Sequence, residues 1–403
     1  MTRFGHAMEK IDERVPGADL PLMSVSQTRG VIRRSELTDA PQRAESLDNY
    51  KVCRANDIVF NKMSIRSGAM GVAAEDGLVT YHYEVMRPRE GTDPHFVAYL
   101  MKSSWFTEEL IKRERGIGAG DQANVRTTEV PFSVLKTIDA YIPDHAEQRA
   151  IVDYLDRETA RIDALIKEQG RLIEMLRGRR QDVIRAAVLG TENPFAPTAD
   201  TAFTAIGHHF SVTLGKMLDA GKVVRADDEM LPYIRAGNIQ DDGLKLNDVN
   251  EMPYSAAEAA NLNLLAGDLL VVEGGAVGTN EVIRQDMPGW SFQKTVNRLR
   301  PIDGWSSAWL GYLLRTYRDI GVIDIVCNKS TIPHLTAEKL RAMRVPSVPP
   351  EAQIRVVEML DQETAKIDTL ITESERFVEL SKERRAALIT AAVTGQIDVR
   401  EVA

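Results

Sequence analysis

The chain has 403 residues, of which 43% are hydrophobic and 27% charged, proportions typical of water-soluble globular proteins. Its formal net charge is −9 and no segment is basic overall, so any DNA-binding surface must be local or shared with a more basic partner. The two cysteines, Cys53 and Cys327, lie in unrelated contexts that do not suggest a disulfide framework or a metal site, which favours the reducing cytoplasm. No apolar run approaches the ~20 residues of a membrane helix, and the N-terminus has no signal-peptide core.

The first 142 residues predict a mixed domain of short strands and helices. A long loop, Arg113–Thr128, is expected before the last strand because it is rich in Gly, polar and basic residues. The other expected elements are the strands Leu20–Val25, Val79–Met86 and Val134–Ile142 and the helices Phe96–Met101 and Trp105–Lys112.

The next stretch, Gln148–Gly190, occurs a second time as Gln353–Gly395. Adding 205 to each residue number aligns the two copies without a gap, and about half of their positions are identical. Identity over that length indicates an internal duplication. Gly190 and Gly395 supply the same C-terminal stop for a helix.

Apolar residues recur every seven positions in both copies, which predicts long helices with an a/d seam. Each copy could instead be a surface helix over its own domain. The length of the seam and its polar interruptions at matched positions favour an antiparallel coiled coil of the two helices. These interruptions are Glu158, Gln169 and Arg179 in the first copy and Glu363, Ser374 and Arg384 in the second. The expected pairing residues are Ile151, Leu155, Ile162, Leu165, Leu172, Leu176 and Val183, and Val356, Leu360, Ile367, Leu370, Phe377 and Leu388.

Residues 203–346 resemble 1–142 more distantly, for example in Ala266–Val272 against Ala55–Phe60. The stretch Ala205–Leu218 has no obvious counterpart at the start of the chain, so the first domain is expected to be abbreviated, or the chain to begin later than its relatives. The predicted class is α+β (mixed α/β) with a pseudo-two-fold internal repeat. The expected order is a globular domain (1–142), a helix (143–190), a linker (191–202), a globular domain (203–346) and a helix (347–403).

This order, with its repeated helices, resembles the specificity subunit of type I restriction-modification enzymes. The helix entry from Glu147-Gln148 through Leu155-Asp156 to Ile162-Asp163 is similar to that family's signature, although the second copy has Ala352 in place of the acidic residue. Gly267-Asp268 and Gly275–Gly278 are similar to the strand-and-glycine motif of a target recognition domain.

The resemblance implies a non-catalytic subunit in which each globular domain reads one half of a split, asymmetric DNA site. It implies that the helices set the spacer and dock two modification subunits, which carry S-adenosylmethionine and methylate adenine. It also implies restriction subunits that use ATP and Mg²⁺. The sequence itself contains no phosphate loop and no Asn/Asp-Pro-Pro-Tyr/Phe tetrapeptide, and it has no metal-ligand spacing. We therefore expect no cofactor and no catalytic or metal site in this chain.

Base edges are read by Arg, Lys, Asn, Gln, Ser or Thr on loops that reach a groove. The DNA-binding candidates in the first domain are Lys62, Arg66, Arg113, Arg115, Gln122, Asn124 and Arg126, and those in the second are Arg235, Asn238, Gln240, Asn280, Gln293, Lys294, Asn328, Lys329, Ser330 and Thr331. Two other classes of function stay open: a coiled-coil scaffold that binds only proteins, which the acidic balance favours slightly, and a self-sufficient enzyme, which the missing motifs disfavour.

Overall fold

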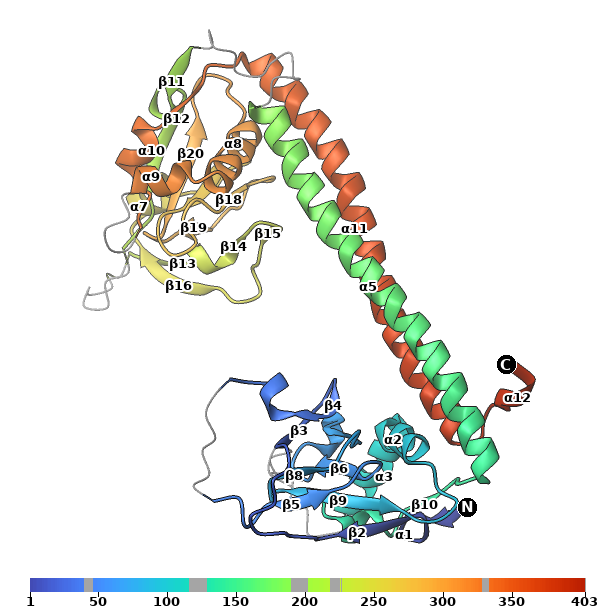
Figure 1. Ribbon diagram of the computed structural model, residues 1–403. Helices are drawn as coiled ribbons and strands as arrows, with labels where there is room; N and C mark the ends of the chain where they lie inside the picture. The colour runs from blue at the N-terminus through green and yellow to red at the C-terminus, as the bar shows by residue number, and fades with distance from the viewer. Residues whose placement is uncertain are drawn as a thin grey trace. The chain divides into compact units, whose positions relative to one another are not determined.

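The computed structural model describes residues 1–39, 46–115, 129–189, 202–217, 225, 227–327 and 333–402. It contains two compact units, Met1–Arg171 with Glu375–Ala403, and Leu172–Ser374 (Figure 1). The helices α5 (His145–Leu189) and α11 (Pro350–Val393) each begin in one unit and end in the other. Each unit therefore combines a globular head with one segment of each long helix, whereas the sequence predicted separate head and helix segments.

The first head is built on a four-stranded antiparallel sheet in the order β2-β9-β6-β7. Because successive side chains of a strand point to opposite faces, the sheet contributes to two cores. Ile58 and Phe60 pack with helices α2 and α3, whereas Val59 and Val85 pack against the small strands β3 to β5 and β8. The bounds are β1 Thr2–Arg3, α1 Phe4–Ala7, β2 Met8–Ile11, β3 Met23–Ser26, β4 Gly30–Arg33, β5 Lys51–Cys53, β6 Ile58–Asn61, β7 Met70–Val72, β8 Gly77–Val79, β9 Tyr83–Pro88, α2 Pro94–Lys102, α3 Ser104–Arg115, α4 Phe132–Leu135 and β10 Asp139–Ala140.

The second head repeats this plan with a sheet in the order β12-β20-β17-β18. Leu269 and Val271 pack with helix α8, and Leu270 and Val272 pack with a three-stranded sheet in the order β16-β13-β19. The bounds are β11 Phe203–Ala205, α6 Ile206–His209, β12 Phe210–Leu214, β13 Glu229–Ile234, β14 Ile239–Gln240, β15 Gly243–Leu244, β16 Asn250–Tyr254, α7 Ala256–Asn261, β17 Leu269–Val272, β18 Asn280–Val282, β19 Ser291–Phe292, β20 Val296–Pro301, α8 Ser307–Asp319, α9 Val322–Cys327, α10 Ala337–Ala342 and β21 Arg344–Pro346.

The start of the first head corrects the expectation of an abbreviated domain. Its β1, α1 and β2 run Thr2–Ile11, and β1 pairs with β10. In the second head β11, α6 and β12 have the same order, and β11 pairs with β21. Thr2–Ile11 is therefore the counterpart of Phe203–Leu214, which sequence similarity alone did not reveal.

Two predicted strands of the first head were wrong in part. Val134–Ile142 contains the end of the short helix α4 and then the two-residue strand β10. Val79–Met86 is interrupted, because β8 ends at Val79 and β9 begins at Tyr83. The predicted helices Phe96–Met101 and Trp105–Lys112 lie within α2 and α3. Part of the predicted loop, 116–128, lies outside the described residues, as does most of the predicted linker 191–202.

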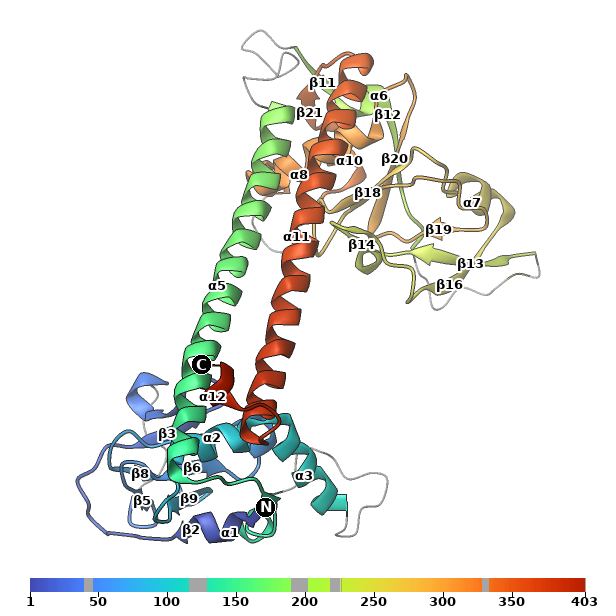
Figure 2. The same cartoon turned by 90° about the vertical axis from the view of Figure 1, so that its right-hand side faces the viewer.

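Within each unit, the segments of α5 and α11 lie side by side with opposite chain directions (Figures 1 and 2). Half of the predicted seam is correct, since Leu155, Ile162, Leu360 and Ile367 are buried, and Leu176, Val183 and Leu388 are half-buried. The other half was shifted by one residue. Leu165, Leu370 and Phe377 are 45%, 49% and 43% exposed, and Leu172 is half-buried. Ile151 and Val356 are also buried, and like Leu155 and Leu360 they belong to clusters shared with the heads.

The second row of the seam lies one residue C-terminal to the predicted row that contains Leu165 and Leu172. On α5 it contains Thr159, Ile166, Ile173 and Arg180, all buried or half-buried, and α11 has the corresponding positions from Thr364 to Arg385. The threonines and arginines made this row look polar, so the neighbouring row of leucines looked more suitable. Thr159 and Thr364 satisfy their hydroxyls locally by donating to the carbonyls of Leu155 and Leu360.

Candidate nucleic-acid interface

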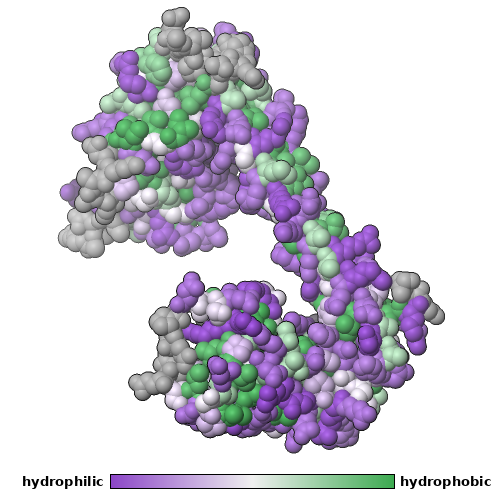
Figure 3. Space-filling view, in the orientation of Figure 1, coloured by the Kyte–Doolittle hydropathy of each residue, from purple (hydrophilic) through white to green (hydrophobic). Residues whose placement is uncertain are grey.

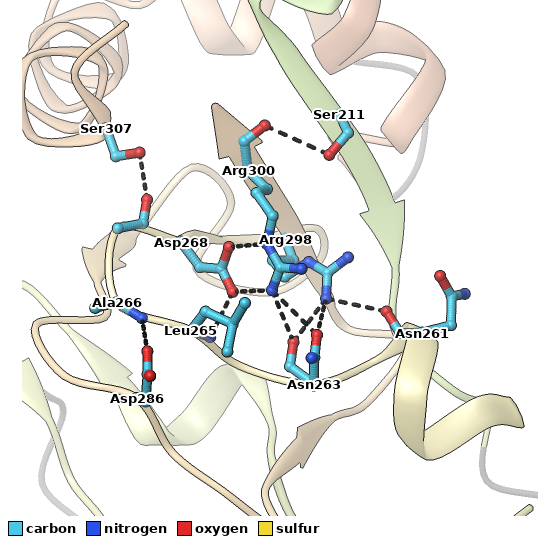
Figure 4. A network of polar contacts seen from close by, with 11 residues as sticks. Ser211, Asn261, Asn263, Leu265, Ala266, Asp268, Asp286, Arg298, Arg300 and Ser307 are labelled. Atoms are coloured by element: carbon cyan, nitrogen blue, oxygen red, sulfur yellow. Dashed lines mark hydrogen bonds and ion pairs between the residues drawn. The ribbon is translucent and has the colours of Figure 1, made fainter. Parts of the chain in front are cut away.

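A buried carboxylate fixes the main sheet of each head. In the second head Asp268 precedes β17 and accepts two bonds from Arg300 at the end of β20, at 2.6 and 2.7 Å, and one from the backbone N–H of Leu265 (Figure 4). In the first head Asp57 accepts from Arg87 at 2.8 and 2.9 Å. Both carboxylates are 1% exposed, and hydrogen bonds to them raise the pKa of the two arginines. The loops of each head are therefore attached to a rigid frame.

One buried glutamine joins each head to a long helix. The side-chain carbonyl of Gln148 accepts from the N–H of Asp93, the N-cap of α2, at 2.8 Å, and its amide donates to the Pro143 carbonyl at 2.7 Å. Gln353, which lies 205 positions later, accepts from the N–H of Ser306, the N-cap of α8, and donates to the Val348 carbonyl, both at 2.8 Å. Sequence reasoning missed both roles, although the identity of these two residues at the repeat interval was a usable signal.

A tyrosine-aspartate pair completes each junction. Tyr99 of α2 donates to Asp156 of α5 at 2.6 Å, and Tyr312 of α8 donates to Asp361 of α11 at 2.7 Å. Burial and the neighbouring carboxylate raise the pKa of both tyrosines to about 12, so they stay protonated donors throughout the physiological range. The two heads are thus seated on their helices by the same contacts.

An ion pair links the segments of α5 and α11 within each unit. In the first unit Arg385 Nε lies 2.9 Å from Asp163, and in the second Arg180 Nε lies 2.8 Å from Asp368. Adding 205 to Arg180 and Asp163 gives Arg385 and Asp368, so the two ion pairs are repeats of each other.

In the second head, three predicted DNA-binding residues lie at one edge. Strands β13 and β19 are parallel neighbours, so the residues that follow them meet at the same end. Arg235 follows β13, and Gln293 and Lys294 follow β19. The Gln293 N–H donates to the Ile234 carbonyl at 2.8 Å, which connects the two strand ends. Lys294 is exposed, Gln293 is half-buried, and Arg235 is paired with Asp248.

The remaining candidates of this head differ in accessibility. Asn238 and Asn280 are only 3% and 1% exposed, and their amides donate to carbonyls inside the head, so these two side chains are structural and are not presented to a groove. Gln240 is exposed and donates to the Gly237 carbonyl. Asn328, Lys329, Ser330 and Thr331 lie outside the described residues.

The candidates of the first head are partly engaged by acidic neighbours. Lys62, 19% exposed, pairs with Glu129 at 3.0 Å. Arg113 pairs with Glu109 and also contacts Thr137, which ties it to the helix surface. Arg66 is half-buried beside Ile65 in a 3₁₀ turn. Gln122, Asn124 and Arg126 lie outside the described residues, as does the side chain of Arg115 at the end of α3.

Within the described ranges no group of three or more His, Cys, Asp or Glu residues could hold a metal ion. In the same part of the chain no helix is long and apolar enough to cross a membrane.

Comparisons with known proteins complement this geometry. No protein-family profile matches the sequence. The specificity subunit of the type I restriction enzyme StySPI from Salmonella potsdam is 24% identical over 192 residues, which are 46% of this chain and 39% of that relative. The match thus spans well under half of the relative's length.

Two solved structures match over almost the whole chain. A chain from a study of complex assembly and conformational transition of the type I R-M system aligns with a TM-score of 0.76 and 17% identity, covering 98% of this chain and 97% of that one. The HsdS subunit from Thermoanaerobacter tengcongensis aligns with a TM-score of 0.60 and 17% identity, covering 98% and 96%. The chain therefore has the fold of the HsdS subunit, which is the fold that the resemblance of its repeated helices implied.

Proposed function

We propose that this chain is the DNA sequence-reading subunit of a type I restriction-modification system. Each head binds one half of a split, asymmetric site, and the chain contributes no catalytic group of its own. The observation that carries the proposal is the repeated junction: Gln148 and Gln353 seat two similar heads on two similar helices. Two heads that are each seated on a long helix by the same contacts, and whose exposed residues differ, suit a target with two different halves.

The long helices carry the features of a second binding surface. Leu165, Phe377 and Leu380 belong to the first unit and are 43–53% exposed. At the repeat interval of 205 residues, these three correspond to Leu370, Leu172 and Met175 of the second unit. Of these, Leu370 is 49% exposed and Met175 is 65% exposed. Apolar surface is visible along the helices in Figure 3. Two equivalent apolar sets fit two copies of one partner, which we assign as the modification subunits.

The chemistry is assigned to those partners. The modification subunits supply S-adenosylmethionine and methylate adenine, and restriction subunits supply ATP- and Mg²⁺-dependent cleavage. A basic partner also offsets the net charge of −9, which by itself opposes approach to DNA. The proposed chain is thus a reader and an assembly scaffold.

The test is a methylated-adenine map of DNA from cells that carry the modification subunit, with and without this chain. We expect a split motif that is present only with the chain. An unchanged map in cells that methylate their DNA would refute the proposal. A motif with one defined half would restrict reading to one head.

A scaffold that binds only proteins is the second candidate, favoured by the acidic net charge and by the exposed apolar residues of the long helices. Binding to random duplex DNA separates the two functions. A reader binds weakly, and the logarithm of its affinity falls linearly with the logarithm of salt concentration, whereas a protein-only scaffold shows no such binding.

A further inference from the structure

The turn between β8 and β9 of the first head has an equivalent in the second head. Register defines the equivalence, because Ile58 lies opposite Met86 in one sheet and Leu269 lies opposite Leu299 in the other. Counting back from these pairs, Thr80, Tyr81 and His82 correspond to Gln293, Lys294 and Thr295. Both turns are closed by the same hydrogen bond, from Tyr83 N–H to the Thr80 carbonyl and from Val296 N–H to the Gln293 carbonyl, each at 2.9 Å.

The surroundings of the two turns also correspond. Lys62 follows β6, and its backbone carbonyl accepts a hydrogen bond from the Val130 N–H at 3.0 Å. Glu273 follows β17, and its carbonyl accepts a hydrogen bond from the Leu335 N–H at 2.8 Å. Because antiparallel neighbours end together, Lys62 lies beside His82 and Glu273 lies beside Thr295. Each turn therefore lies at the same place beside the main sheet of its head.

The side chains presented at this place are chemically different. Tyr81 is 52% exposed and its ring contacts that of exposed His82, with the ring centroids 4.0 Å apart and the ring planes tilted by 37°. Within the described residues, the Tyr81 hydroxyl and the His82 ring nitrogens have no hydrogen-bond partner. The equivalent position of the second head presents Lys294, a cation, next to the amide of Gln293. The side-chain carbonyl oxygen of Gln293 accepts a hydrogen bond from the Thr295 hydroxyl at 3.1 Å, and Lys294 remains exposed beside it. One backbone turn that presents two different sets of polar side chains is suited to reading two different sequences.

We propose that the turn Thr80–His82 is a specificity determinant of the first head and that Lys294 is its counterpart in the second. The inference rests on the proposed DNA-reading function and adds the residues that read. Tyrosine and histidine offer ring faces and hydrogen-bonding groups to base edges, and lysine donates to guanine O6 and N7. The predicted strand Val79–Met86 hid this turn, although the polar run Thr-Tyr-His was a signal against a continuous strand.

The test exchanges the two exposed residues in the full chain, co-expressed with its modification subunit, as the single substitutions Tyr81→Lys and Lys294→Tyr. Methylated adenines are mapped genome-wide, and methylation rates are measured on duplexes that vary one half-site at a time. We expect Tyr81→Lys to change base preference in one half-site and Lys294→Tyr in the other, with the spacer unchanged. The rate on the original half-site should fall about tenfold or more for each base pair no longer read.

The inference is overturned if both variants methylate the wild-type motif with unchanged preferences and rates. It is also overturned if the rate falls equally on all sequences, which indicates a phosphate contact. The substituted side chains are exposed, and an unchanged melting temperature of the purified complex shows that folding is intact. If deletion of the chain leaves the wild-type methylation map unchanged, the proposed function itself fails, so the two failures are distinguishable.

Discussion

The seating of the second head on α11 should depend on Gln353, which is fully buried. Gln353→Leu keeps the volume of the side chain but leaves the Ser306 N–H and the Val348 carbonyl without the partners they have at 2.8 Å. Each unsatisfied buried group costs about 1–3 kcal/mol. Burial of the apolar leucine side chain offsets part of this loss of stability. We expect a net loss of about 2–4 kcal/mol, which for a unit of this size lowers the melting temperature by roughly 5–15 °C.

Calorimetry of the full chain measures this loss, and hydrogen exchange locates it. We expect faster exchange at the start of α8 and at residues 346–350, with little change in the first head. Gln148→Leu is the reciprocal variant and should loosen the first head at Asp93. Gln181→Leu, at an exposed position of α5, is the matched control and should change stability by no more than about 0.5 kcal/mol. If Gln353→Leu destabilises no more than this control, the glutamine does not seat the head.

Three further predictions concern spacing, independence of the heads and pH. Removal of one heptad from each long helix, Glu168–Glu174 and Ser374–Leu380, leaves both interhelix ion pairs intact and shortens the helices by ~10 Å, about three base-pair steps. Methylation mapping should show a shorter spacer between unchanged half-sites. A change in the bases recognised, with the spacer unchanged, would contradict the proposal that the helices set the spacer. Replacement of 203–346 by the head of another specificity subunit should change one half-site in the same assay, and a change in both would refute independent heads. The hydrogen bond from Lys216, with help from the Ser255 N–H, lowers the pKa of Glu258 to about 2. Because this pKa is depressed in the folded state, ionised Glu258 contributes fully to the free energy of unfolding above about pH 4.5. The contribution is lost as the pH falls towards 2. Glu258→Gln should therefore cost up to about 1 kcal/mol at pH 6 and less at pH 3, measured by urea unfolding, and an equal difference at both pH values would exclude this titration.

The sequence predicted the long helices well because a repeat of 43 residues averages out local irregularities. It failed on half of the seam, where the true row contains Thr159 and Arg180. Both residues occupy seam positions. The Thr159 hydroxyl donates to its own helix backbone, and the Arg180 guanidinium pairs with Asp368 while its half-buried aliphatic part lies at the seam. Simple apolar patterning counts such residues as interruptions and selects the exposed leucines next to them.

The heads were less predictable because their elements are short and tertiary contacts decide them. Val134–Ile142 looked like a strand, yet its first residues close a helical turn that packs Leu135 into the core. Asn238 and Asn280 looked like base readers, but their amides bond the interior of the head. Residue type alone cannot separate a buried amide from an exposed one. By contrast, Arg235, Gln293 and Lys294 meet because two parallel strands end together, which no local pattern encodes.

The ion pairs Arg385–Asp163 and Arg180–Asp368 have a genetic consequence. In each unit an arginine from one copy of the repeat meets an aspartate from the other, and the roles are exchanged between the units. This reciprocity is the property of a contact between two identical chains related by a two-fold axis, here carried within one polypeptide. An exposed head residue can mutate alone, because it has no partner in the other copy. A charge reversal at Asp163 instead costs up to about 1 kcal/mol, and a reversal at Arg385, some 220 codons downstream, restores the attraction. A change in one copy of the helix is therefore compensated in the other copy, whereas the two heads are free to diverge.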